Sequence, residues 1–469
     1  MNEDLIGKQI VILGFARQGI AFARFAARNG AKVIISDLRS QEQLQESMEA
    51  LQNLEIEYVL GKHPMGLLEG TDLLIISGGV PANLPLVQAA RQQGINISND
   101  SQEFAIRCPA AVIGITGSAG KSTTTALMGE MAKAAGLRTW VGGNIGRPLI
   151  ADLDEMQPGD IVVQELSSFQ LEIWQHSPEF AAVLNITPNH LDRHESLAAY
   201  SHAKANILRY QDETGIAVLS ADDPGAMELA PLAKGRLRLF SIEREVRDGA
   251  FVRDGFVWLR SPAAQEKAVI SVADIKLRGL HNLSNICAAV TLADSAGLPV
   301  SAMVEGLSSF RGVPHRLELV NTINGVQYVN DSIATAPERA LAALASYHEP
   351  IILLAGGKDK NMVWDAWAKQ VAKQVKQVIL FGALADMLMN HLEQEINSHK
   401  GLLQISRVED LPSAVQLAAA VAQIGDIVLL SPGGTSYDAY QDFEERGRHF
   451  RTLVTEIASE TTPEQRKAI

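Results

Sequence analysis

Short runs of apolar residues alternate with stretches of helical periodicity along almost the whole chain. An apolar run bounded by glycine, proline or asparagine is typical of a buried strand, and its alternation with helices favours α/β domains with mostly parallel sheets. The first helix is expected to end at Arg28, because Asn29-Gly30 follows it and these residues stop helices. The strands expected in this first part are Gln9–Leu13, Lys32–Ser36 and Leu73–Ser77.

A second unit is expected to open with a strand at Ala110–Ile115, a glycine-rich turn and a helix at Ser122–Ala135. Leu127 and Met131 lie one turn apart on that helix, and Gly136 follows it, as glycine commonly does at a helix end. The other elements expected here are strands at Ile161–Gln164 and Ala181–Asn185 and a hairpin over Gly249–Arg260 that turns at Asp254-Gly255.

The last third is expected to begin with a hairpin that turns at Asn324-Gly325, a dipeptide that favours tight β-turns. Strand and helix patterns alternate after it, with strands at Ile351–Leu354, Val378–Phe381 and Ile427–Leu430. At 469 residues the chain is too long for one ordinary core. We therefore predict three α/β domains, at residues 1–100, 101–312 and 313–469.

The composition is typical of a globular protein in a reducing compartment. No apolar run approaches the ~18 residues that span a bilayer, and the first residues are acidic where a signal peptide would be basic. The two cysteines, Cys108 and Cys287, form neither a disulfide framework nor a metal-binding pair. A net charge of −13 argues against non-specific nucleic-acid binding. We expect a soluble, cytoplasmic protein.

The sharpest chemical signal is the run Gly117–Thr123, which lies between a predicted strand and a predicted helix. Glycines let backbone N–H groups converge on phosphate oxygens, and the helix start adds a positive dipole end. Lys121 is expected to bind the β- and γ-phosphates, and Ser122 to offer its hydroxyl oxygen to Mg²⁺. The loop is shorter than the common G-x-x-x-x-G-K-[ST] pattern, so a glycine-rich turn with an incidental lysine is the competing interpretation. The predicted nucleotide-binding residues are Gly117, Ser118, Ala119, Gly120, Lys121, Ser122 and Thr123.

Polar residues follow the next two predicted strands, at the usual ligand edge of an open α/β sheet. Glu165 ends one strand, and an acid at such a position commonly binds the metal ion of a bound nucleotide. Considered alone, Glu165 could equally be a helix cap or an ion-pair partner. The other strand leads to His190, four residues before His194. No H-E-x-x-H pattern supports zinc. We expect His190 near the metal or the substrate and His194 at the surface.

These motifs, together with several others in the same order, resemble those of the Mur ligase family. The resemblance implies a Rossmann-like N-terminal domain, a central P-loop ATPase-like domain and a Rossmann-like C-terminal domain. Gly142–Gly146 and Ser431–Asp438 look most like the member that adds glutamate. The matching runs are Gly117–Thr123, Glu165–Leu171, Asn185–Arg193, His281–Asn285, Pro314–Arg316 and Asn330–Ser332.

The resemblance implies ATP and two Mg²⁺ ions as cofactors. Lys204 falls where the family carries a carbamylated lysine bound to the second ion, and an unmodified surface lysine is the alternative. Asn285, Arg316 and Asp331 match positions that hold ATP, the last two on the C-terminal domain. The implied metal ligands are Ser122, Glu165, His190 and Lys204, and the implied catalytic residues are Lys121, Glu165, His190 and Lys204.

The first domain carries an incomplete dinucleotide fingerprint. Gly14–Gly19 follows a strand and Asp37 ends the next strand, but Ala16 stands in place of the second glycine. The resemblance implies that this domain holds a UDP group instead, and a turn that serves only helix packing is the alternative. The implied contacts are Arg17, Gln18, Arg39 and Gly79 for the UDP group and Asn144 and His190 for the muramoyl group.

The activity that the resemblance implies is the ATP-dependent addition of D-glutamate to UDP-N-acetylmuramoyl-L-alanine through an acyl phosphate, in peptidoglycan precursor synthesis. Ile333 departs from the pattern, because many glutamate-adding members have lysine there, and Gly433-Gly434 replaces an Ala-Cys or Ala-Ala pair. L-Glutamate therefore stays open as the substrate. The implied glutamate contacts are Thr335, Lys360, Ser436, Tyr437 and Phe443.

Two further interpretations stay open on the sequence. One is a folylpolyglutamate synthase-like ligase of the same superfamily. The other, of a different class, is a nucleotide-gated sensor or a pyridine-nucleotide binder that uses the first domain. In every case we expect small-molecule partners and a monomer, with neither nucleic-acid binding nor membrane insertion.

Overall fold

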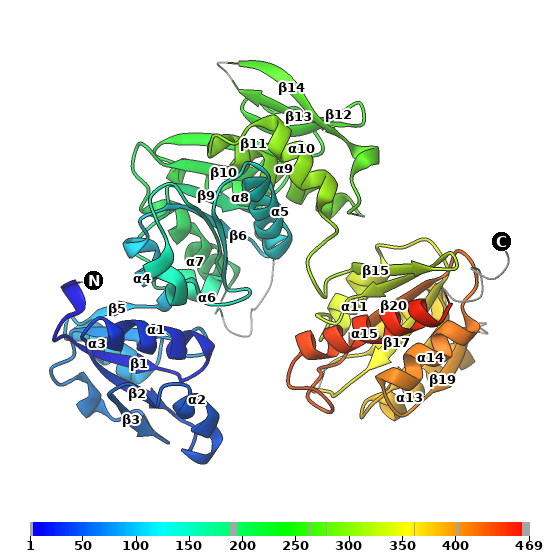
Figure 1. Ribbon diagram of the computed structural model, residues 1–469, viewed down its shortest axis with the longest axis horizontal. Helices are drawn as coiled ribbons and strands as arrows, with labels where there is room; N and C mark the ends of the chain where they lie inside the picture. Colours follow the sequence, from blue (N-terminus) through cyan, green and yellow to red (C-terminus); the bar gives the residue numbers. More distant parts are fainter. Residues whose placement is uncertain are drawn as a thin grey trace. The chain divides into compact units, whose positions relative to one another are not determined.

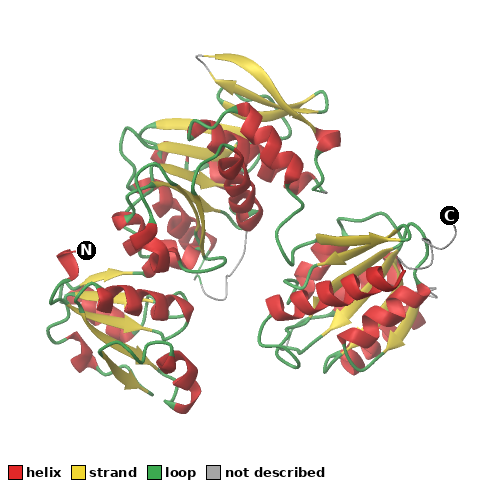
Figure 2. Ribbon diagram, viewed as in Figure 1, coloured by secondary structure: helices red, strands yellow, loops and turns green. Residues whose placement is uncertain are grey.

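The computed structural model describes residues 3–187, 194, 196–261, 264–277, 279–360, 362–399 and 403–461. Contacts divide the chain into two compact units, Met1–Phe310 and Arg311–Ile469. Within the described residues the strands form three sheets, each packed against helices, as Figures 1 and 2 show. This confirms the predicted α/β fold class, whereas the three predicted domain ranges stay a prediction.

The first sheet has the strand order β3-β2-β1-β4-β5, and all neighbouring strands are parallel. Helix α1 (Arg17–Arg28) buries Phe22 and Phe25 and ends at Asn29, as predicted. The strands are β1 (Gln9–Leu13), β2 (Lys32–Asp37), β3 (Ile56–Leu60), β4 (Leu73–Ile76) and β5 (Asn96–Ser98), and the other α-helices are α2 (Gln45–Glu49), α3 (Pro85–Gln92) and α4 (Asp100–Arg107).

The second sheet has the order β14-β13-β12-β11-β10-β9-β6-β8-β7. It is parallel from β7 to β12 and antiparallel in the hairpins that follow. The strands are β6 (Ala111–Thr116), β7 (Thr139–Gly143), β8 (Ile161–Glu165), β9 (Phe180–Val183), β10 (Ile216–Ser220), β11 (Arg236–Ser241), β12 (Gly249–Arg253), β13 (Phe256–Ser261) and β14 (Ala264–Ser271).

Helices α5 (Lys121–Ala134), α9 (Leu280–Ser295) and α10 (Val300–Ser309) pack against one another beside this sheet. Leu127 and Met131 of α5 are fully buried, and burial of such side chains contributes roughly 1.5–3 kcal/mol each. The predicted turn of the first hairpin is confirmed, because Asp254 and Gly255 both have positive φ. The remaining helices of this region are α6 (Ser168–Leu171), α7 (Leu197–Arg209) and α8 (Pro224–Met227).

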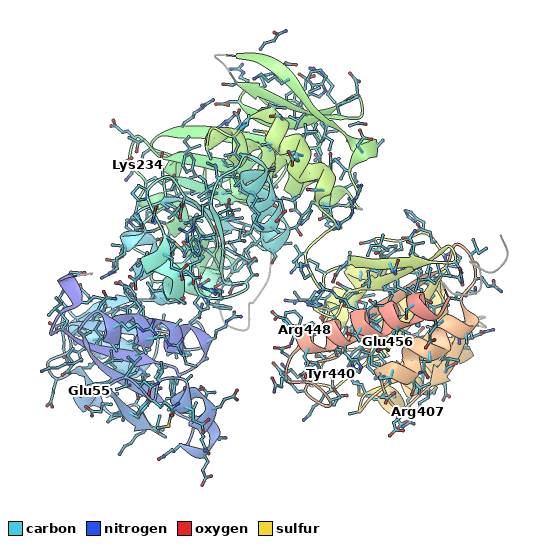
Figure 3. All side chains as sticks on the ribbon, in the orientation of Figure 1. Glu55, Lys234, Arg407, Tyr440, Arg448 and Glu456 are labelled. Carbon is cyan, nitrogen blue, oxygen red and sulfur yellow. The ribbon has the colours of Figure 1, made fainter. Side chains whose placement is uncertain are left out.

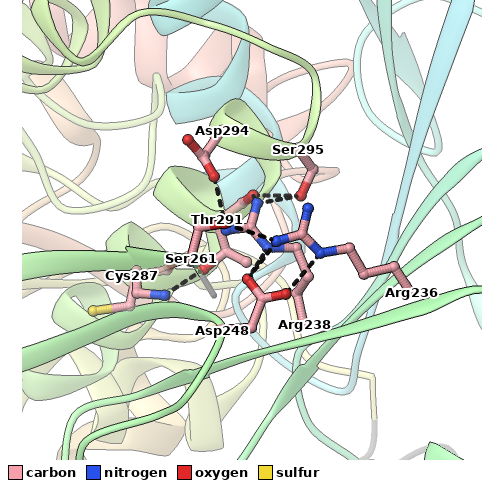
Figure 4. A network of polar contacts seen from close by, with 9 residues as sticks. Arg236, Arg238, Asp248, Ser261, Cys287, Thr291, Asp294 and Ser295 are labelled. Carbon is pink, nitrogen blue, oxygen red and sulfur yellow. Dashed lines mark hydrogen bonds and ion pairs between the residues drawn. The ribbon is translucent and has the colours of Figure 1, made fainter. Parts of the chain in front are cut away.

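Charged side chains such as Glu55, Lys234 and Arg407 lie exposed on the surface (Figure 3). Arg238 is an exception, because its side chain is fully buried between β11 and α9. Figure 4 shows it between two carboxylates, with Nε donating to Asp248 at 2.8 Å and Nη2 lying 2.7 Å from Asp294. Its remaining donors reach Thr291 and Ser295 of α9. A buried arginine is thus neutralised by acids on both sides.

The second unit is built on a sheet of order β15-β16-β20-β17-β18-β19, in which only the β15-β16 pair is antiparallel within the described residues. The predicted turn at Asn324-Gly325 joins that pair, again with positive φ at both residues. Its strands are β15 (Glu318–Ile323), β16 (Val326–Asn330), β17 (Ile351–Gly356), β18 (Val375–Phe381), β19 (Gln404–Arg407) and β20 (Ile427–Gly433), and its helices are α11 (Pro337–Leu344), α12 (Asp365–Gln374), α13 (Ala385–His399), α14 (Leu411–Val421) and α15 (Phe443–Thr461).

The predicted element ends differ from the observed ones by a few residues. The strand predicted at Ala181–Asn185 is β9, which ends at Val183. The reason is that Asn185 turns away from the ladder, and its carbonyl accepts the Ser118 N–H at 3.0 Å instead. The predicted helix Ser122–Ala135 is α5, which begins one residue earlier. No helix in the described residues is both long and apolar enough to cross a membrane.

Candidate active site

The loop between β6 and α5 is shaped by two glycines. Gly117 and Gly120 have φ of 158° and 86°, and Gly120 directly precedes the helix. A Cβ atom added at Gly120 would lie 2.2 Å from the Asn285 side-chain oxygen. Asn285 of α9 lies directly against the loop, and together with the positive φ of Gly120 this leaves room only for glycine at that position. The structure thus brings together two positions predicted to bind the nucleotide that are 165 residues apart in the sequence.

The loop is anchored to the segment that follows β9. Asn185 Oδ1 accepts the Ala119 N–H at 2.8 Å. Ser118 Oγ donates to the Thr187 carbonyl at 3.0 Å and accepts from the Tyr200 hydroxyl at 3.1 Å. These contacts fix the conformation of the loop, which is the kind of preorganisation that a phosphate-binding loop needs. The sequence motifs contained Asn185 and Thr187, whereas no sequence signal pointed to Tyr200.

Lys121 and Ser122 occupy the first turn of α5. Lys121 Nζ folds back onto the loop and donates to the Gly117 carbonyl at 2.9 Å and the Ser118 carbonyl at 3.4 Å. Ser122 and Thr123 are buried at the same helix end. An ammonium group and a helix N-terminus thus meet at one loop, which is the arrangement that binds phosphate groups.

Glu165 ends β8 beside this loop, and its side chain is 1% exposed. Its Oε1 accepts from Asn144 Nδ2 at 2.8 Å, while its Oε2 is buried with no hydrogen-bond partner among the described residues. The Asn144 N–H also donates to the Glu165 carbonyl at 2.9 Å. A buried carboxylate oxygen without a donor is costly. The unpartnered Oε2 is suited to binding a cation.

Lys204 of α7 is 1% exposed, so the alternative of a surface lysine is wrong. Its Nζ donates to the Gly117 carbonyl at 2.9 Å and to Thr116 Oγ1 at 3.3 Å, and it lies 4.6 Å from the centre of the Tyr200 ring. Burial, reinforced by the charge of Lys121, lowers the pKa of Lys204 well below its ordinary value, against the opposing effect of Glu165. A larger share of the amine is therefore neutral than in an exposed lysine.

The surface position expected for His194 is wrong. His194 is 5% exposed, its Nε2 lies 2.9 Å from Ser168 Oγ, and its ring stacks on Phe169. It also meets the Tyr200 ring edge to face. The aromatic side chains of Phe169 and Tyr200, from two separate segments, pack against its ring, and local sequence does not reveal these contacts. His190 lies outside the described residues.

The turn after β1 is joined to the end of β2 by Asp37. Its carboxylate accepts the Phe15 N–H at 2.7 Å and the Arg39 guanidinium at 2.8 Å. Burial raises the pKa of Asp37, but the hydrogen bonds from Arg39 and Phe15 outweigh it and bring the pKa to about 2. Gln18 Oε1 accepts the Gly78 N–H at 3.2 Å, next to Gly79. Arg17, Arg39 and Gly79 are exposed, so three of the predicted UDP contacts face solvent around one turn region.

In the second unit, Asp331 follows β16 and is buried. Its carboxylate accepts from Ser431 Oγ at 2.9 Å and from the Leu317 N–H at 3.2 Å. Burial raises the pKa of Asp331 to about 7, against the effects of these bonds and of the Arg316 and Arg339 charges. Arg316 Nε is buried with no acceptor among the described residues. The charge of Arg316 acts on Asp331, and ATP binding by these two residues stays a prediction.

Four of the predicted glutamate contacts come from loops at the C-terminal ends of β16, β17 and β20, and the fifth, Phe443, is the first residue of α15. Lys358 and Thr435 bridge two of these loops through paired backbone bonds of 2.8 and 2.9 Å. The Lys360 ammonium lies 5.2 Å from the centre of the Tyr437 ring. Ser436, which precedes Tyr437 in the sequence, is buried. The Phe443 carbonyl accepts from Ser332 Oγ at 2.8 Å. These loops also contact a buried arginine, Arg446, that sequence reasoning missed.

Three family descriptions match the chain in the order of its sheets. "Mur ligase MurD-like, N-terminal domain" matches residues 8–99, "Mur ligase middle domain" matches 115–293, and "Mur ligase, glutamate ligase domain" matches 315–434. The UDP-N-acetylmuramoylalanine–D-glutamate ligase of Symbiobacterium thermophilum is 41% identical over 96% of this chain and 98% of its own length. The ligase of the same name from Pelotomaculum thermopropionicum is 37% identical over 97% of this chain and 99% of its own. The chain belongs to the Mur ligase family.

As a Mur ligase, the chain is an ATP-dependent amide ligase whose middle domain binds ATP. Solved structures show the same fold at low identity. The UDP-N-acetylmuramate–alanine ligase MurC of Thermotoga maritima has a TM-score of 0.58 at 21% identity and covers 96% of this chain and 99% of its own. The FolC protein of E. coli has a TM-score of 0.55 at 16% identity over 76% of this chain and 93% of its own. The latter likeness shows the fold alone and gives the folylpolyglutamate synthase interpretation no further support.

Proposed function

We propose that this Mur ligase joins the amino group of D-glutamate to the carboxylate of UDP-N-acetylmuramoyl-L-alanine and converts ATP to ADP and phosphate. The observation that carries the proposal is the near full-length identity of 37–41% to relatives that bear the name of this activity. The local geometry supports it, because Lys121 folds onto the loop that begins at Gly117 and the buried Glu165 ends the neighbouring strand. A sensor without catalysis, or a pyridine-nucleotide binder, has no comparable support.

The reaction is uphill in water, because a carboxylate must be activated before an amine can attack it. Transfer of the γ-phosphoryl group to the carboxylate gives an acyl phosphate, and the amine then displaces phosphate. Both the phosphate chain and the carboxylate are anionic, so the protein must reduce their repulsion. Lys121 and the backbone N–H groups of residues 120–122 would do this at the loop. The amine attack requires that water be excluded from the acyl phosphate.

The residues around the loop fit a divalent metal that prefers oxygen ligands. Glu165 Oε2 is buried without a donor among the described residues, and Ser122 is buried at the start of α5. Among the residues that the structure describes, no three or more His, Cys, Asp or Glu side chains are grouped so that they could hold a metal ion. Mg²⁺ usually combines few protein ligands with waters and phosphate oxygens. When bound, Mg²⁺ would neutralise charge between the two anionic reactants. The proposed ligands are Ser122, Glu165, His190 and Lys204.

Lys204 would become an anionic oxygen ligand if CO₂ added to its amine. The addition requires the neutral amine, which burial and the charge of Lys121 favour. The contacts of Nζ with Gly117 and Thr116 hold it beside the loop. We therefore propose carbamylation of Lys204 and a second Mg²⁺ ion at this position.

The remaining site residues are divided among three ligands. Asn285, Arg316 and Asp331 would hold ATP, and Asn144 and His190 would face the muramoyl group. The UDP group would lie on the turn region that Asp37 and Gln18 organise in the first sheet. The residues proposed for UDP are Arg17, Gln18, Arg39 and Gly79, and those proposed for glutamate are Thr335, Lys360, Ser436, Tyr437 and Phe443. We also propose that the enzyme is cytoplasmic and monomeric.

A coupled ADP-release assay tests this function. The purified full-length chain is given Mg-ATP and either UDP-N-acetylmuramoyl-L-alanine or a folate substrate, with D-glutamate, L-glutamate or no amino acid. We expect ADP release that depends on both substrates and is faster with D-glutamate. Faster release with L-glutamate would overturn the stereochemistry alone. Release only with a folate substrate, or no release with any of them, would overturn the proposed function.

A further inference from the structure

The loop that follows β3 places a histidine beside the end of β2. His63 Nδ1 lies 2.7 Å from Ser36 Oγ, and Ser36 Oγ donates to the Lys62 carbonyl at 3.1 Å. A serine hydroxyl has a single proton to donate. Because Ser36 gives this proton to Lys62, the hydrogen bond between Ser36 and His63 must use a proton on Nδ1.

The other ring nitrogen of His63 is therefore a hydrogen-bond acceptor. Burial lowers the pKa of His63, against the opposing charge of Asp37, so the ring is neutral at neutral pH. A neutral imidazole with its proton on Nδ1 has a lone pair on Nε2. The side chain is half-buried, and no donor among the described residues forms a hydrogen bond with Nε2. Nε2 is thus an unused acceptor at the carboxyl edge of the first sheet.

The loop that carries His63 is bonded to the turn after β2. Asp37, the last residue of β2, pairs in register with Leu60, the last residue of β3. The Gly61 N–H then donates to the carbonyls of Asp37 at 2.8 Å and Arg39 at 3.1 Å. These bonds fix His63 beside the turn that carries Arg39, one of the proposed UDP contacts.

Asp37 has no acceptor to offer to a ligand at this edge. In dinucleotide-binding sheets the acid that ends the second strand accepts a hydrogen bond from a ribose hydroxyl. Asp37 Oδ1 accepts the Arg39 backbone N–H at 2.9 Å and Arg39 Nε at 3.0 Å, and Oδ2 accepts the Phe15 N–H at 2.7 Å and Arg39 Nη2 at 2.8 Å. A carboxylate has about four lone-pair sites. All of them are used within the chain, so a ribose at this edge needs another acceptor.

Two large apolar side chains are exposed on the same two loops. Leu38 directly follows Asp37 and is 64% exposed, and Met65 lies two residues after His63 and is 55% exposed. A single exposed apolar side chain is common on protein surfaces, but these two accompany an unused acceptor. Small-molecule sites combine apolar side chains with a few polar groups that fix the orientation of the ligand. The two loops around His63 have this composition.

We propose that His63 is a further UDP contact, whose Nε2 accepts a hydrogen bond from one of the two ribose hydroxyls. His63 then makes the contact that the acid ending the second strand makes in dinucleotide-binding sheets, while Asp37 holds Arg39 in place. The guanidinium groups of Arg17 and Arg39 have donors only, so they suit phosphate oxygens and leave the hydroxyl proton to His63. The inference rests on the proposed function, because it adds a contact to the UDP group of the same substrate.

The proposal is tested by calorimetric titration of the full-length enzyme with UDP, 2′-deoxy-UDP and 3′-deoxy-UDP. UDP with a methyl group on uracil N3 is a fourth probe, which tests a contact to the base instead. For each variant below we would also measure the KM for UDP-N-acetylmuramoyl-L-alanine and the KM for ATP by ADP release.

Three variants separate the ligand contact from the bond to Ser36. His63→Gln has an oxygen acceptor that reaches about as far as Nε2. His63→Asn keeps a donor for Ser36 but is too short to place an acceptor at Nε2, and His63→Phe keeps a flat ring without nitrogen. The matched control is His391→Phe, which changes a histidine of α13 in the second unit whose side chain is 30% exposed.

We expect the unaltered enzyme to bind one of the deoxy analogues roughly 3- to 10-fold more weakly than UDP, the scale of one neutral hydrogen bond. His63→Phe and His63→Asn should bind UDP as weakly as that analogue and should no longer distinguish the two. His63→Gln should keep part of the difference. The KM for UDP-N-acetylmuramoyl-L-alanine should rise by a similar factor in His63→Phe, with an unchanged ATP KM, and His391→Phe should behave as the unaltered enzyme does.

A merely structural role of His63 would weaken the binding of UDP and of both deoxy analogues by the same factor, and this result would overturn the inference. Equal affinity of the unaltered enzyme for all three would overturn it as well. If His63→Phe abolishes discrimination against the N3-methyl probe instead, the contact is to the base and the ribose assignment is wrong. If His63→Phe does not fold, the comparison of His63→Gln with His63→Asn decides. An unaltered enzyme that binds no UDP would contradict the proposed function itself, so the two failures are distinguishable.

Discussion

Asn144 holds one oxygen of the Glu165 carboxylate, with 2.8 Å between Nδ2 and Oε1, and the other oxygen has no partner among the described residues. Asn144 therefore holds the carboxylate through Oε1 and leaves the buried Oε2 without a hydrogen-bond donor among those residues. We predict that Glu165→Gln, which keeps the shape and removes the charge, raises the Mg²⁺ concentration for half-maximal ADP release by roughly 10–100-fold, as changes around metal sites commonly do. A Mg²⁺ titration at saturating ATP measures this. Asn144→Ala should give a smaller shift, and an unchanged titration curve for Glu165→Gln would remove Glu165 from the metal site.

Lys121→Ala should abolish turnover and leave the fold intact. The lysine would compensate charge on the transferring phosphoryl group, and such groups contribute on the order of a thousandfold or more to phosphoryl transfer. ADP release measures the loss, and circular dichroism and thermal unfolding check the fold. A folded variant with normal ADP release would contradict the assignment of the loop Gly117–Thr123.

Lys204→Ala should lose most of the activity, because the proposed carbamate oxygen ligands disappear with the side chain. Excess bicarbonate should not restore it, since no amine remains to be carbamylated. Acetate or formate should restore part of it by supplying carboxylate oxygens in the vacated space. Near-normal activity of Lys204→Ala, measured by ADP release, would exclude a catalytic role for the carbamate.

Asp331 should make the stability of the nucleotide-free enzyme depend on pH. Its pKa is raised from 3.8 to about 7 by burial, so the folded chain holds this proton more tightly than the unfolded chain does. Between these two pKa values the unfolded chain has lost the proton and the folded chain still holds it. Ionisation therefore favours unfolding, and stability falls as the pH rises from about 4 to about 7, by up to roughly 1.4 kcal/mol per pH unit.

Asp331→Asn should remove this dependence. The side-chain oxygen of the asparagine can still accept from the Leu317 N–H. Its NH₂ group takes the place of the second carboxylate oxygen and can donate to Ser431 Oγ. Urea unfolding of both proteins at pH 5 and pH 7.5 provides the comparison. The unaltered protein should lose more stability between these pH values than the variant does, and equal losses would contradict the raised pKa.

Lys360→Ala should raise the glutamate KM by an amount equivalent to about 1–3 kcal/mol, the contribution of a charge-assisted contact. Lys360 is exposed and lies over the Tyr437 ring in the free structure, so its ammonium is available to a ligand carboxylate. The ATP KM should barely change. Steady-state kinetics with each substrate varied in turn measures both, and equal increases would place Lys360 on the nucleotide instead.

Much of the fold and one part of the site followed from local sequence patterns. The strand before Gly117 and the helix after Lys121 were predicted to within a residue, because an apolar run and a helical period are properties of a few neighbouring residues. The hairpin turns at Asp254-Gly255 and Asn324-Gly325 were predicted for the same reason, since tolerance of positive φ is a property of the residue types Gly, Asn and Asp. The family motifs then indicated which residues belong to the site.

The burial and the hydrogen-bond partners of the site residues depended instead on contacts between distant segments. Nothing near His194 indicates that Phe169 and Tyr200 enclose it, and Lys204 was as compatible with an exposed position as with its burial beside Gly117. Arg446 is the clearest case: its acceptors, Ser332 and Gly434, come from loops that only the parallel sheet brings together. Hydrophobic periodicity specifies which face of an element is buried. The partners, burial and charge balance of a polar side chain are set by the elements that the fold places around it.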